Sequence, residues 1–444
     1  MPLIINIGNL CGILPEEVKC KCGDGMNEVA CLENAWIKTE DGIITDFGTM
    51  YKVPSYEKNC GGEGGCHHEG GGGCHGGGNC HHGGGGGCHG GGGCHGGGRP
   101  EVYDAQGGFV LPAFCDSHTH AVYAGGRENE FLDKLSGASY EEIAERGGGI
   151  LGSVKQLHNT SEDELFAQSL ERIHEMMTFG SGAIEIKSGY GLSTEDELKM
   201  LRVIRRIKES VPAQIKATFL GAHAVPPGIS REAYVDSVIN EMLPQVAQEN
   251  LAEFVDVFCD RGFFTPEDTA RILEAAARYG LKPKIHANEL AVSGGVQVGV
   301  EHNALSVDHL EQMTDAEIEV LKSGSTMPVM LPGASFFLGL PYGKARKVVD
   351  AGLPLALASD FNPGSSPAGD MRFIMALGCI KMRLTPNEAF NACTINGACA
   401  MGLEKEVGSI TRGKRANLII TKAIPSLTFI PYCYRTPIIR GILL

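Results

Sequence analysis

The sequence lacks the features of an exported, membrane-spanning or nucleic-acid-binding chain. Its 38 Lys and Arg are outnumbered by 53 Asp and Glu, and the formal net charge of −15 argues against a general surface for nucleic acids or anionic membranes. No uninterrupted apolar run is long enough to span a bilayer. The N-terminus has neither the basic segment nor the long apolar core of a signal peptide, so we expect a cytoplasmic protein without membrane or nucleic-acid partners.

A disulfide framework is also not expected, although the chain has 16 cysteines. Thiols stay reduced in the cytosol, so we expect these residues to be free thiols or metal ligands. The pair in Cys20-Lys21-Cys22 is too closely spaced for a usual zinc knuckle and has no second pair nearby. We expect this pair to be structural.

Residues 60–98 contain no apolar side chain other than Cys. These 39 residues comprise 23 Gly, six Cys, seven His, two Glu and one Asn, and five of the cysteines are followed directly by His. Such a segment cannot form a core, and its glycines keep the chain flexible. Because thiolate and imidazole together suit Zn, Cu or Ni, the composition predicts a low-complexity insert that binds these metals. A repeat expansion in a tolerant surface loop is the alternative.

The rest of the chain has a globular composition, with 43% hydrophobic and 20% charged residues overall, and exceeds one average domain in length. Short β-rich runs occupy residues 1 to about 58, and the apolar run 109–113 indicates another strand. Further apolar or β-branched runs follow it at residues 183–187, 216–220, 254–258, 282–286, 305–308, 326–331 and 354–359. Together with the run 109–113 they make eight strands.

Helix-start signals lie between these strands. Each is a Ser or Thr followed three residues later by Glu or Asp: Ser139/Glu142, Ser161/Glu164, Thr194/Glu197, Thr265/Asp268, Thr314/Glu317 and Thr385/Glu388. Eight strands alternating with helices predict an α/β fold, an eightfold β/α (TIM-like) barrel. Such barrels keep their chemistry at the C-terminal ends of the strands, which directs attention to the residues found there.

The predicted strand ends carry a consistent set of polar residues. His118 and His120 follow the first strand at alternate positions, so their side chains point the same way. The later strand ends supply Lys187, Tyr190, His223, His286, Glu289, Asp308, His309, Asp360 and Asn362. Three histidines and a carboxylate can bind one divalent ion and leave a position for water, whose pKa the ion lowers toward neutrality. Lys187 either binds substrate or caps the barrel.

Seven motifs together carry a resemblance to a known family. They are Asp116-Ser117-His118-Thr119-His120, Gly125-Gly126-Arg127-Glu128, Gly147-Gly148-Gly149-Ile150, Lys187-Ser188-Gly189-Tyr190-Gly191-Leu192, Gly221-Ala222-His223, Lys284-Ile285-His286-Ala287 and Ser359-Asp360-Phe361-Asn362-Pro363-Gly364-Ser365-Ser366. The set resembles the amidohydrolase superfamily of metal-dependent hydrolases over residues 100–435. It is most similar to the members that hydrolyse the cyclic amide 4-imidazolone-5-propionate to N-formimino-L-glutamate in histidine degradation.

The resemblance implies a second domain and a role for each motif residue. A small β-sandwich would combine residues 1–59, 99–112 and 405–444, interrupted by the insert 60–98, with the barrel at 113–404. One Zn or Fe ion would be held by His118, His120, His286 and Asp360. The small-molecule substrate would be bound by Arg127, Tyr190, His223, Asn362, Gly364 and Ser365. The catalytic residues would be Glu289, His309 and Asp360. The guanidinium of Arg127 suits the propionate carboxylate because its planar fork can pair bidentately.

The sequence departs from this family in three places. Asn288 stands where the family usually has Asp, the insert 60–98 is foreign to the pattern, and the C-terminus is shortened. Two other functions stay open: a hydrolase or deaminase of another cyclic amide or imine, and a metal-handling protein that uses the insert. The choice between Zn and Fe and the oligomeric state, a homodimer included, also stay open.

Overall fold

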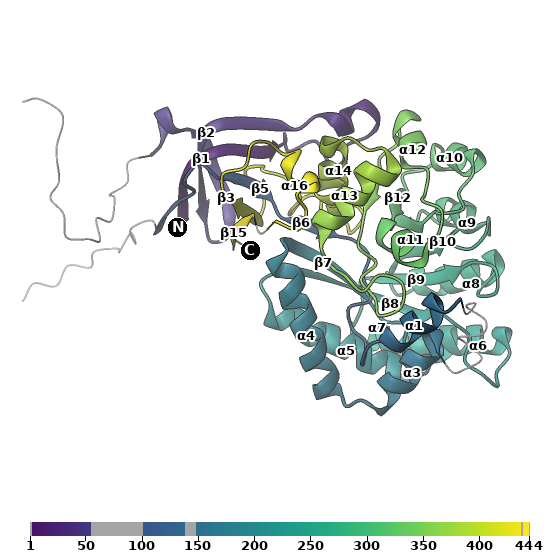
Figure 1. Ribbon diagram of the computed structural model, residues 1–444. Coiled ribbons are helices and arrows are strands. Elements are labelled where there is room, and N and C mark those ends of the chain that lie inside the picture. Colours follow the sequence, from purple (N-terminus) through teal and green to yellow (C-terminus); the bar gives the residue numbers. More distant parts are fainter. Residues whose placement is uncertain (1, 55–100, 138–147, 437, 444) are drawn as a thin grey trace, which may run out of the picture.

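The computed structural model describes residues 2–54, 101–137, 148–436 and 438–443. The insert 60–98 and the predicted helix start at Ser139 lie outside the described residues. The prediction that the insert binds metals therefore concerns residues that the structure does not describe. Figure 1 shows a sheet built from the N-terminal strands on one side and a barrel surrounded by helices on the other. Among the described residues, no helix combines the length and the apolar character needed to cross a membrane.

The small domain is one mixed sheet made from both ends of the chain. Its strands are β1 (Pro2–Ile13), β2 (Ala30–Glu40), β3 (Ile43–Thr49), β4 (Glu101–Asp104), β5 (Phe109–Pro112), β14 (Leu418–Thr421) and β15 (Ile439–Leu443). The order is β15-β14-β5-β1-β2-β3, and β4 pairs with β1 off this path. Both faces of β1 are buried, since Ile4 and Ile7 join one apolar cluster while Leu3 and Ile5 pack on Trp36 in another. An irregularity in the pairing with β2 between Ile4 and Ile7 interrupts the strict alternation. The N- and C-terminal segments therefore share one domain.

The predicted barrel is confirmed. Eight parallel strands follow each other in chain order: β6 (Phe114–Asp116), β7 (Ser181–Lys187), β8 (Gln214–Ala222), β9 (Phe254–Cys259), β10 (Lys282–Ala287), β11 (Ser306–His309), β12 (Met327–Met330) and β13 (Ala356–Leu357). The residues after β6 and β13 close the ring. The amide of His120 donates to the carbonyl of Phe361 at 2.9 Å. The amide of Asp360 donates to the carbonyl of His118 at 3.0 Å. The C-terminal ends of the strands thus meet on one face.

The first barrel strand is not the run 109–113, and that prediction is wrong. Phe109–Pro112 is β5 of the small sheet, and the barrel begins with β6 after Ala113. The amide of Ala113 donates to Asn417 of the small domain, while the next amide, Phe114, donates to Gly180 beside the barrel strand β7. Both strands are buried throughout, so no polar residue marks the boundary between them in the sequence.

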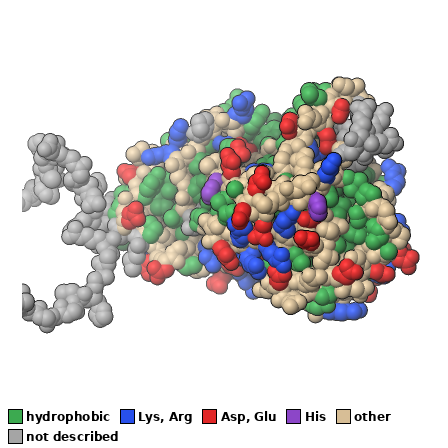
Figure 2. Space-filling view, turned by 90° about the horizontal axis from the view of Figure 1, so that it is seen from below, with side chains coloured by type: hydrophobic (Ala, Val, Ile, Leu, Met, Phe, Trp, Pro, Cys, Tyr) green, Lys and Arg blue, Asp and Glu red, His purple; other side chains and the backbone are tan. Residues whose placement is uncertain are grey.

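Helices cover the outside of the barrel. They are α1 (Glu128–Leu135), α3 (Gly149–Asn159), α4 (Glu162–Thr178), α5 (Thr194–Ser210), α6 (Arg231–Ser237), α7 (Leu243–Gln248), α8 (Pro266–Ala277), α9 (Gly295–Glu301), α10 (Asp315–Leu321), α11 (Pro332–Leu338), α12 (Ala345–Asp350), α13 (Met371–Met382), α14 (Pro386–Cys393), α15 (Ile395–Cys399) and α16 (Phe429–Tyr432). Short helical turns are η1 (Gly23–Asn27), η2 (Met50–Lys52) and the π-helical η3 (Val238–Met242). On the face shown in Figure 2, acidic and basic side chains are interspersed, with no extended patch of one sign.

Most of the predicted helix starts form as expected. Thr265, Thr314 and Thr385 make capping boxes, and the hydroxyl of Ser161 accepts the amide of Glu164. The pair Thr194/Glu197 is wrong. Helix α5 is capped by Ser193, one residue earlier, whose hydroxyl accepts the amide of Asp196 at 3.2 Å. The carboxylate of Glu197 is therefore left for another partner.

One cysteine pair departs from the expectation of free thiols. Cys11 of β1 and Cys31 of β2 are joined by a disulfide, and their Cα atoms lie 4.1 Å apart. The antiparallel register places the two residues directly opposite each other, which sequence spacing alone does not reveal. Cys20 and Cys22 are free thiols, as are Cys115, Cys259, Cys379, Cys393, Cys399 and Cys433.

Candidate active site

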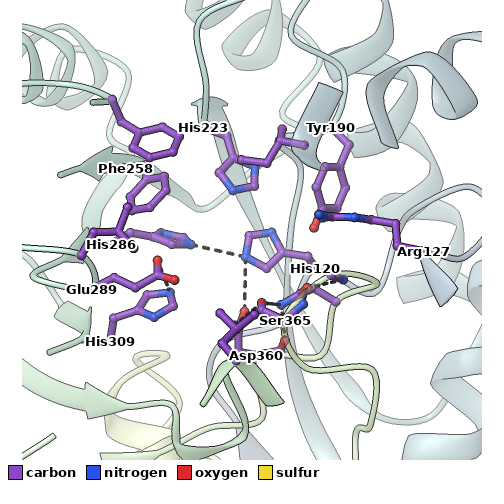
Figure 3. A pocket seen from close by; sticks show the side chains of 16 residues that line it. His120, Arg127, Tyr190, His223, Phe258, His286, Glu289, His309, Asp360 and Ser365 are labelled. Atoms are coloured by element: carbon purple, nitrogen blue, oxygen red, sulfur yellow. Dashed lines mark hydrogen bonds and ion pairs between the residues drawn. The ribbon is translucent and has the colours of Figure 1, made fainter. Parts of the chain in front are cut away.

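The predicted metal ligands converge at the C-terminal face of the barrel. His118 and His120 follow β6, His286 belongs to β10, and Asp360 follows β13. Ligand atoms of the three histidines lie within 4.8 Å of one another. The Oδ1 atom of Asp360 lies 3.6 Å from Nε2 of both His118 and His120, as Figure 3 shows for His120. All four side chains are buried.

The chemistry of these four donors fits a divalent cation. Nε2 of His118 and Oδ1 of Asp360 are buried without a hydrogen-bond partner, and Nε2 of His286 faces Nε2 of His120 at 3.3 Å. Burial lowers the pKa of all three imidazoles, that of His286 to about 3, so the rings are neutral and can act as ligands. Electron pairs facing each other in a closed space are stabilised by a positive ion between them.

Three residues at this face have a left-handed backbone conformation. Asp360 has a φ of +51° and His309 a φ of +84°, in a region that residues with a side chain rarely adopt. Such strain concentrates at functional sites, where the surrounding structure holds it in place. Asn288, at +56°, is also in this region, and its buried side-chain nitrogen has no hydrogen-bond partner. Its oxygen accepts the Ser293 hydroxyl at 3.3 Å.

A buried charge cluster contacts two of the predicted metal ligands. It consists of Glu185, Lys187, Asp256, Lys284 and Asp308, all fully buried. Two of its carboxylates contact ligand rings, because Asp308 is 2.6 Å from Nδ1 of His118 and Asp256 is 2.9 Å from Nδ1 of His286. Such carboxylates fix the ring tautomer and leave the other nitrogen for the metal.

Lysines balance the negative charge of the buried charge cluster. Lys187 Nζ lies 2.8 Å from both Glu185 Oε1 and Asp256 Oδ2, and Lys284 Nζ lies 2.9 Å from Glu185 Oε2. The ammonium of Lys187 thus binds carboxylates inside the barrel and takes no part in lining the pocket. Glu185 and Asp256 were not predicted as site residues, and Lys284 was noted only as part of a motif. The signal for Glu185 and Asp256 was a charged residue within an otherwise largely apolar strand.

One pocket brings together the remaining predicted site residues. Its volume, as the space open to the centre of a water-sized sphere, is about 130 Å³, so it has room only for a small ligand. The predicted residues that line it are Arg127, Tyr190, His223, Glu289, His309, Asn362, Gly364 and Ser365, together with His120, His286 and Asp360. Apolar residues that sequence analysis missed complete the lining: Ile150, Phe258, Phe263, Leu290 and Leu338. Figure 3 shows Arg127 and Tyr190 on one side of the metal ligands, and Glu289 and His309 on the other.

Arg127 is held from two sides. Its Nε and Nη2 donate to Oε2 of Glu130 at 2.9 and 2.6 Å, and the other oxygen of Glu130 accepts the amide of Gly149. A Cβ atom at position 364 would overlap the guanidinium, so glycine there lets Arg127 lie against the loop. The guanidinium therefore has a defined place in the pocket wall.

His223 and Tyr190 lie next to the predicted metal ligand His120. The Nδ1 atom of His223 lies 2.9 Å from the carbonyl oxygen of Gly189, and its ring stacks on His120 with centroids 5.2 Å apart. An Nδ1–H donor to this carbonyl leaves Nε2 as an acceptor. Burial lowers the pKa of His223 to about 4, so the ring is neutral. The Tyr190 ring lies 5.8 Å from His120 and 5.5 Å from His223.

Glu289 and His309 form an acid–base pair at the opposite wall. His309 Nε2 lies 3.6 Å from Glu289, and its Nδ1 lies 3.5 Å from the buried Glu311. Burial raises the pKa of Glu289 to about 7, against the opposing effect of His309. Burial works to lower the pKa of His309, but Glu289 and Glu311 outweigh it and the pKa is raised. A carboxyl whose pKa lies near neutrality can both take and give a proton.

The side chain of Asn362 shapes the loop that carries Asp360. Its nitrogen donates to the Asp360 carbonyl at 2.7 Å and to the Ser365 hydroxyl at 2.6 Å, while its oxygen accepts the amides of Gly364 and Ser365 at 2.8 Å. The Ser365 hydroxyl lies 3.3 Å from Oδ2 of Asp360. Direct contact of Asn362 with substrate stays a prediction.

The sequence and the fold agree on a family. Residues 109–443 match the family model described as "Amidohydrolase family". Solved structures with the same fold include a guanine deaminase from C. acetobutylicum, with a TM-score of 0.65 at 15% identity, covering 100% of this chain and 97% of that one. A triazine hydrolase variant matches with a TM-score of 0.67 at 13% identity, over 100% of this chain and 93% of that one. The chain belongs to the amidohydrolase family.

Curated relatives place the chain more narrowly. It is 50% identical over 436 residues to the imidazolonepropionase of Christiangramia forsetii, covering 98% of this chain and 96% of that protein. It is 48% identical over 444 residues to the imidazolonepropionase of Flavobacterium johnsoniae, covering 100% and 98%. Within the amidohydrolases it therefore groups with the imidazolonepropionases.

Proposed function

We infer that the protein hydrolyses a C–N bond of the cyclic amide 4-imidazolone-5-propionate and releases N-formimino-L-glutamate, a step of histidine degradation. The observation that carries this function is a single pocket that joins the metal-ligand cluster to Arg127 and to the pair Glu289 and His309. The full-length identity to relatives named imidazolonepropionase supports it. Deaminases among the solved structures share the fold at low identity, which does not extend their substrates to this chain.

We propose that His118, His120, His286 and Asp360 hold one Zn or Fe ion. The neutral imidazoles and the carboxylate suit either metal. When bound, the ion supplies Lewis-acid chemistry that activates water for attack on the ring carbonyl. Asp308 and Asp256 hold the rings of His118 and His286 with the ligand nitrogens directed at the site.

The other pocket residues position the substrate and move protons. Arg127 binds the propionate carboxylate, and His223 and Tyr190 contact the imidazolone ring with Gly364 and Ser365 beside it. Glu289, with a pKa raised to about 7, accepts a proton from the attacking water and passes it toward the leaving ring nitrogen. His309, between Glu289 and Glu311, keeps this carboxyl in place. Asp360 serves both as a metal ligand and as a proton acceptor close to the reacting atoms.

The proposal extends to the setting of the enzyme. The domain division is residues 1–59, 99–112 and 405–444 for the small domain and 113–404 for the barrel. We place the enzyme in the cytoplasm with a small-molecule substrate, and a homodimer is the proposed assembly.

The decisive test of the proposed function is turnover of freshly made imidazolonepropionate. Metal content is measured on the same sample, and a panel of other cyclic amides and imines serves as controls. Faster turnover of a panel compound would replace this substrate with that one.

The Arg127→Lys variant is expected to lose about ten- to a hundredfold in kcat/KM, because a point charge cannot reproduce the two hydrogen bonds of a guanidinium fork. The measurement compares imidazolonepropionate with an analogue that lacks the carboxylate. The analogue is expected to be nearly equally poor for wild type and variant. Arg271→Lys, at a surface pair with Asp236, is the matched control and is expected to act like wild type. A large variant effect on the analogue would assign Arg127 to another task.

Replacing residues 60–98 with a short Gly/Ser linker is expected to leave turnover of the metal-saturated enzyme nearly unchanged. The segment has no apolar content to bury, and shortening a surface loop changes the closure entropy only logarithmically. We propose that the insert binds Zn, Cu or Ni and changes how quickly the barrel site reloads. The measurement strips both proteins, adds limiting metal and follows recovery of activity. If both proteins recovered activity equally at every metal concentration, the insert would have no part in supplying metal to the barrel site.

A further inference from the structure

The loop after β7, residues 188–193, sets two of the proposed substrate contacts at once. It carries Tyr190, and its Gly189 carbonyl accepts the Nδ1–H of His223. The loop has unusual backbone, with φ of +114° at Gly189 and +51° at Leu192. A Cβ atom at Gly189 would also crowd Nδ1 of His223 at 2.8 Å. Whatever fixes this loop therefore fixes Tyr190 and the tautomer of His223 together.

The carboxylate of Glu197 is the group that holds the loop. Its Oε1 accepts the amides of Gly191 at 2.7 Å and Leu192 at 3.0 Å, and its Oε2 accepts the amide of Gly189 at 3.1 Å. Glu197 is fully buried, and its carboxylate accepts three backbone amides from one loop. Burial raises its pKa to about 7, against the opposing effect of its hydrogen bonds to the loop.

The geometry separates this task from helix capping. Helix α5 is already capped by Ser193, so its first turn does not need the carboxylate of Glu197. The loop also packs directly on the helix, because a Cβ atom at Gly191 would overlap the backbone of Glu197. The neighbouring Glu195, on the same turn, is exposed. The same helix turn therefore offers one carboxylate bound to the loop and one in solvent.

We propose that Glu197 is a positioning residue that places Tyr190 and His223 for substrate binding by holding the amides of the loop 188–193. The inference rests on the proposed function, in which these two side chains contact the imidazolone ring. It assigns to a residue outside the pocket a part in substrate recognition. It also explains why the loop contains two glycines beside Tyr190, since neither position has room for a side chain.

The test is the Glu197→Gln variant, which keeps the shape of the side chain. It replaces one acceptor oxygen with an NH2 group, a donor that would face the donor amides of the loop. We expect kcat/KM for imidazolonepropionate to fall about tenfold or more, mainly through a higher KM, because a buried amide loses its partner. Barrel metal content, measured in a chain with the insert replaced by a linker, is expected to match wild type. Glu195→Gln removes the same charge from the same helix turn and is expected to leave kcat, KM and metal content unchanged.

A double-mutant cycle separates positioning from a general loss of stability. In a Tyr190→Ala/His223→Ala background, Glu197→Gln is expected to change kcat/KM by less than about threefold, because the side chains it acts through are gone. An undiminished effect there, or a wild-type KM in the single variant, would overturn the proposal. Crystal structures of the Glu197→Gln and wild-type chains give a second readout that needs no substrate. We expect the Gly189 carbonyl to leave Nδ1 of His223, and an unmoved loop would overturn the proposal even if another substrate is found.

Discussion

The Asp360→Asn variant is expected to lose more than about a thousandfold in kcat, because the metal that it helps to hold shifts the pKa of water by roughly nine units. Oδ1 of Asp360 is the buried, unpartnered oxygen that lies 3.6 Å from both His118 and His120. Asparagine removes the negative charge but tolerates the positive φ of this position better than alanine does. The variant should therefore fold while it fails to retain metal.

The measurement pairs kcat with metal content on the same protein. Residues 60–98 are replaced by a linker in every sample, so that metal on the insert does not hide loss from the barrel. Asp315→Asn removes an exposed carboxylate at the start of α10 and is expected to keep full activity and metal. Normal turnover by Asp360→Asn at wild-type metal content would refute the assignment of Asp360 as a ligand.

The Lys187→Met variant is expected to lose about 3–5 kcal/mol of unfolding free energy, the usual cost of removing one partner from a buried ion pair. Lys187 has no exposed surface, and its ammonium lies 2.8 Å from Glu185 and from Asp256. Burial works to lower the pKa of Lys187, but Asp256 and Glu185 outweigh it and the pKa is raised, so the lysine is charged. Methionine fills similar space and leaves two carboxylates without their shared cation.

Denaturant unfolding followed by circular dichroism gives the free energy. Lys322→Met is the matched control, since Lys322 pairs with Glu319 at 2.7 Å on the surface, and it is expected to cost less than about 1 kcal/mol. Equal stability of the two variants would mean that the carboxylates of the buried charge cluster do not need Lys187. The difference in unfolding free energy between the two variants measures how far burial strengthens an ion pair.

The sequence predicted the barrel and the convergence of the proposed metal ligands because both follow from a coarse rule. Parallel strands in a closed ring end on one face, so His118, His286 and Asp360 had to approach each other whatever the details of packing. The pocket residues Arg127 and Tyr190 came from motifs that resemble a family. Neither argument needs side-chain geometry, and for that reason neither was disturbed by local errors.

Features that depend on register and on contacts between distant segments were not predicted. Cys11 and Cys31 are joined because the register of β1 and β2 sets them opposite each other. Glu197 looked like part of a capping box because its spacing from Thr194 matched, but its carboxylate turns to the loop. The apolar run 109–113 was counted as the first barrel strand because β5 and β6 are equally buried, although the resemblance placed residues 99–112 in the small domain.

The hydrogen bonds that close the barrel have a consequence for how it folds and opens. They join His118 and His120, at the beginning of the barrel sequence, to Asp360 and Phe361 near its end. Bringing such distant segments together has a high loop-closure entropy, so this seam is expected to form late in folding. An ion held by His118, His120 and Asp360, as we propose, would have ligands on both sides of the seam and would bind only the closed ring. Metal release and opening of the seam would then be linked equilibria, and a higher concentration of free metal would make opening rarer.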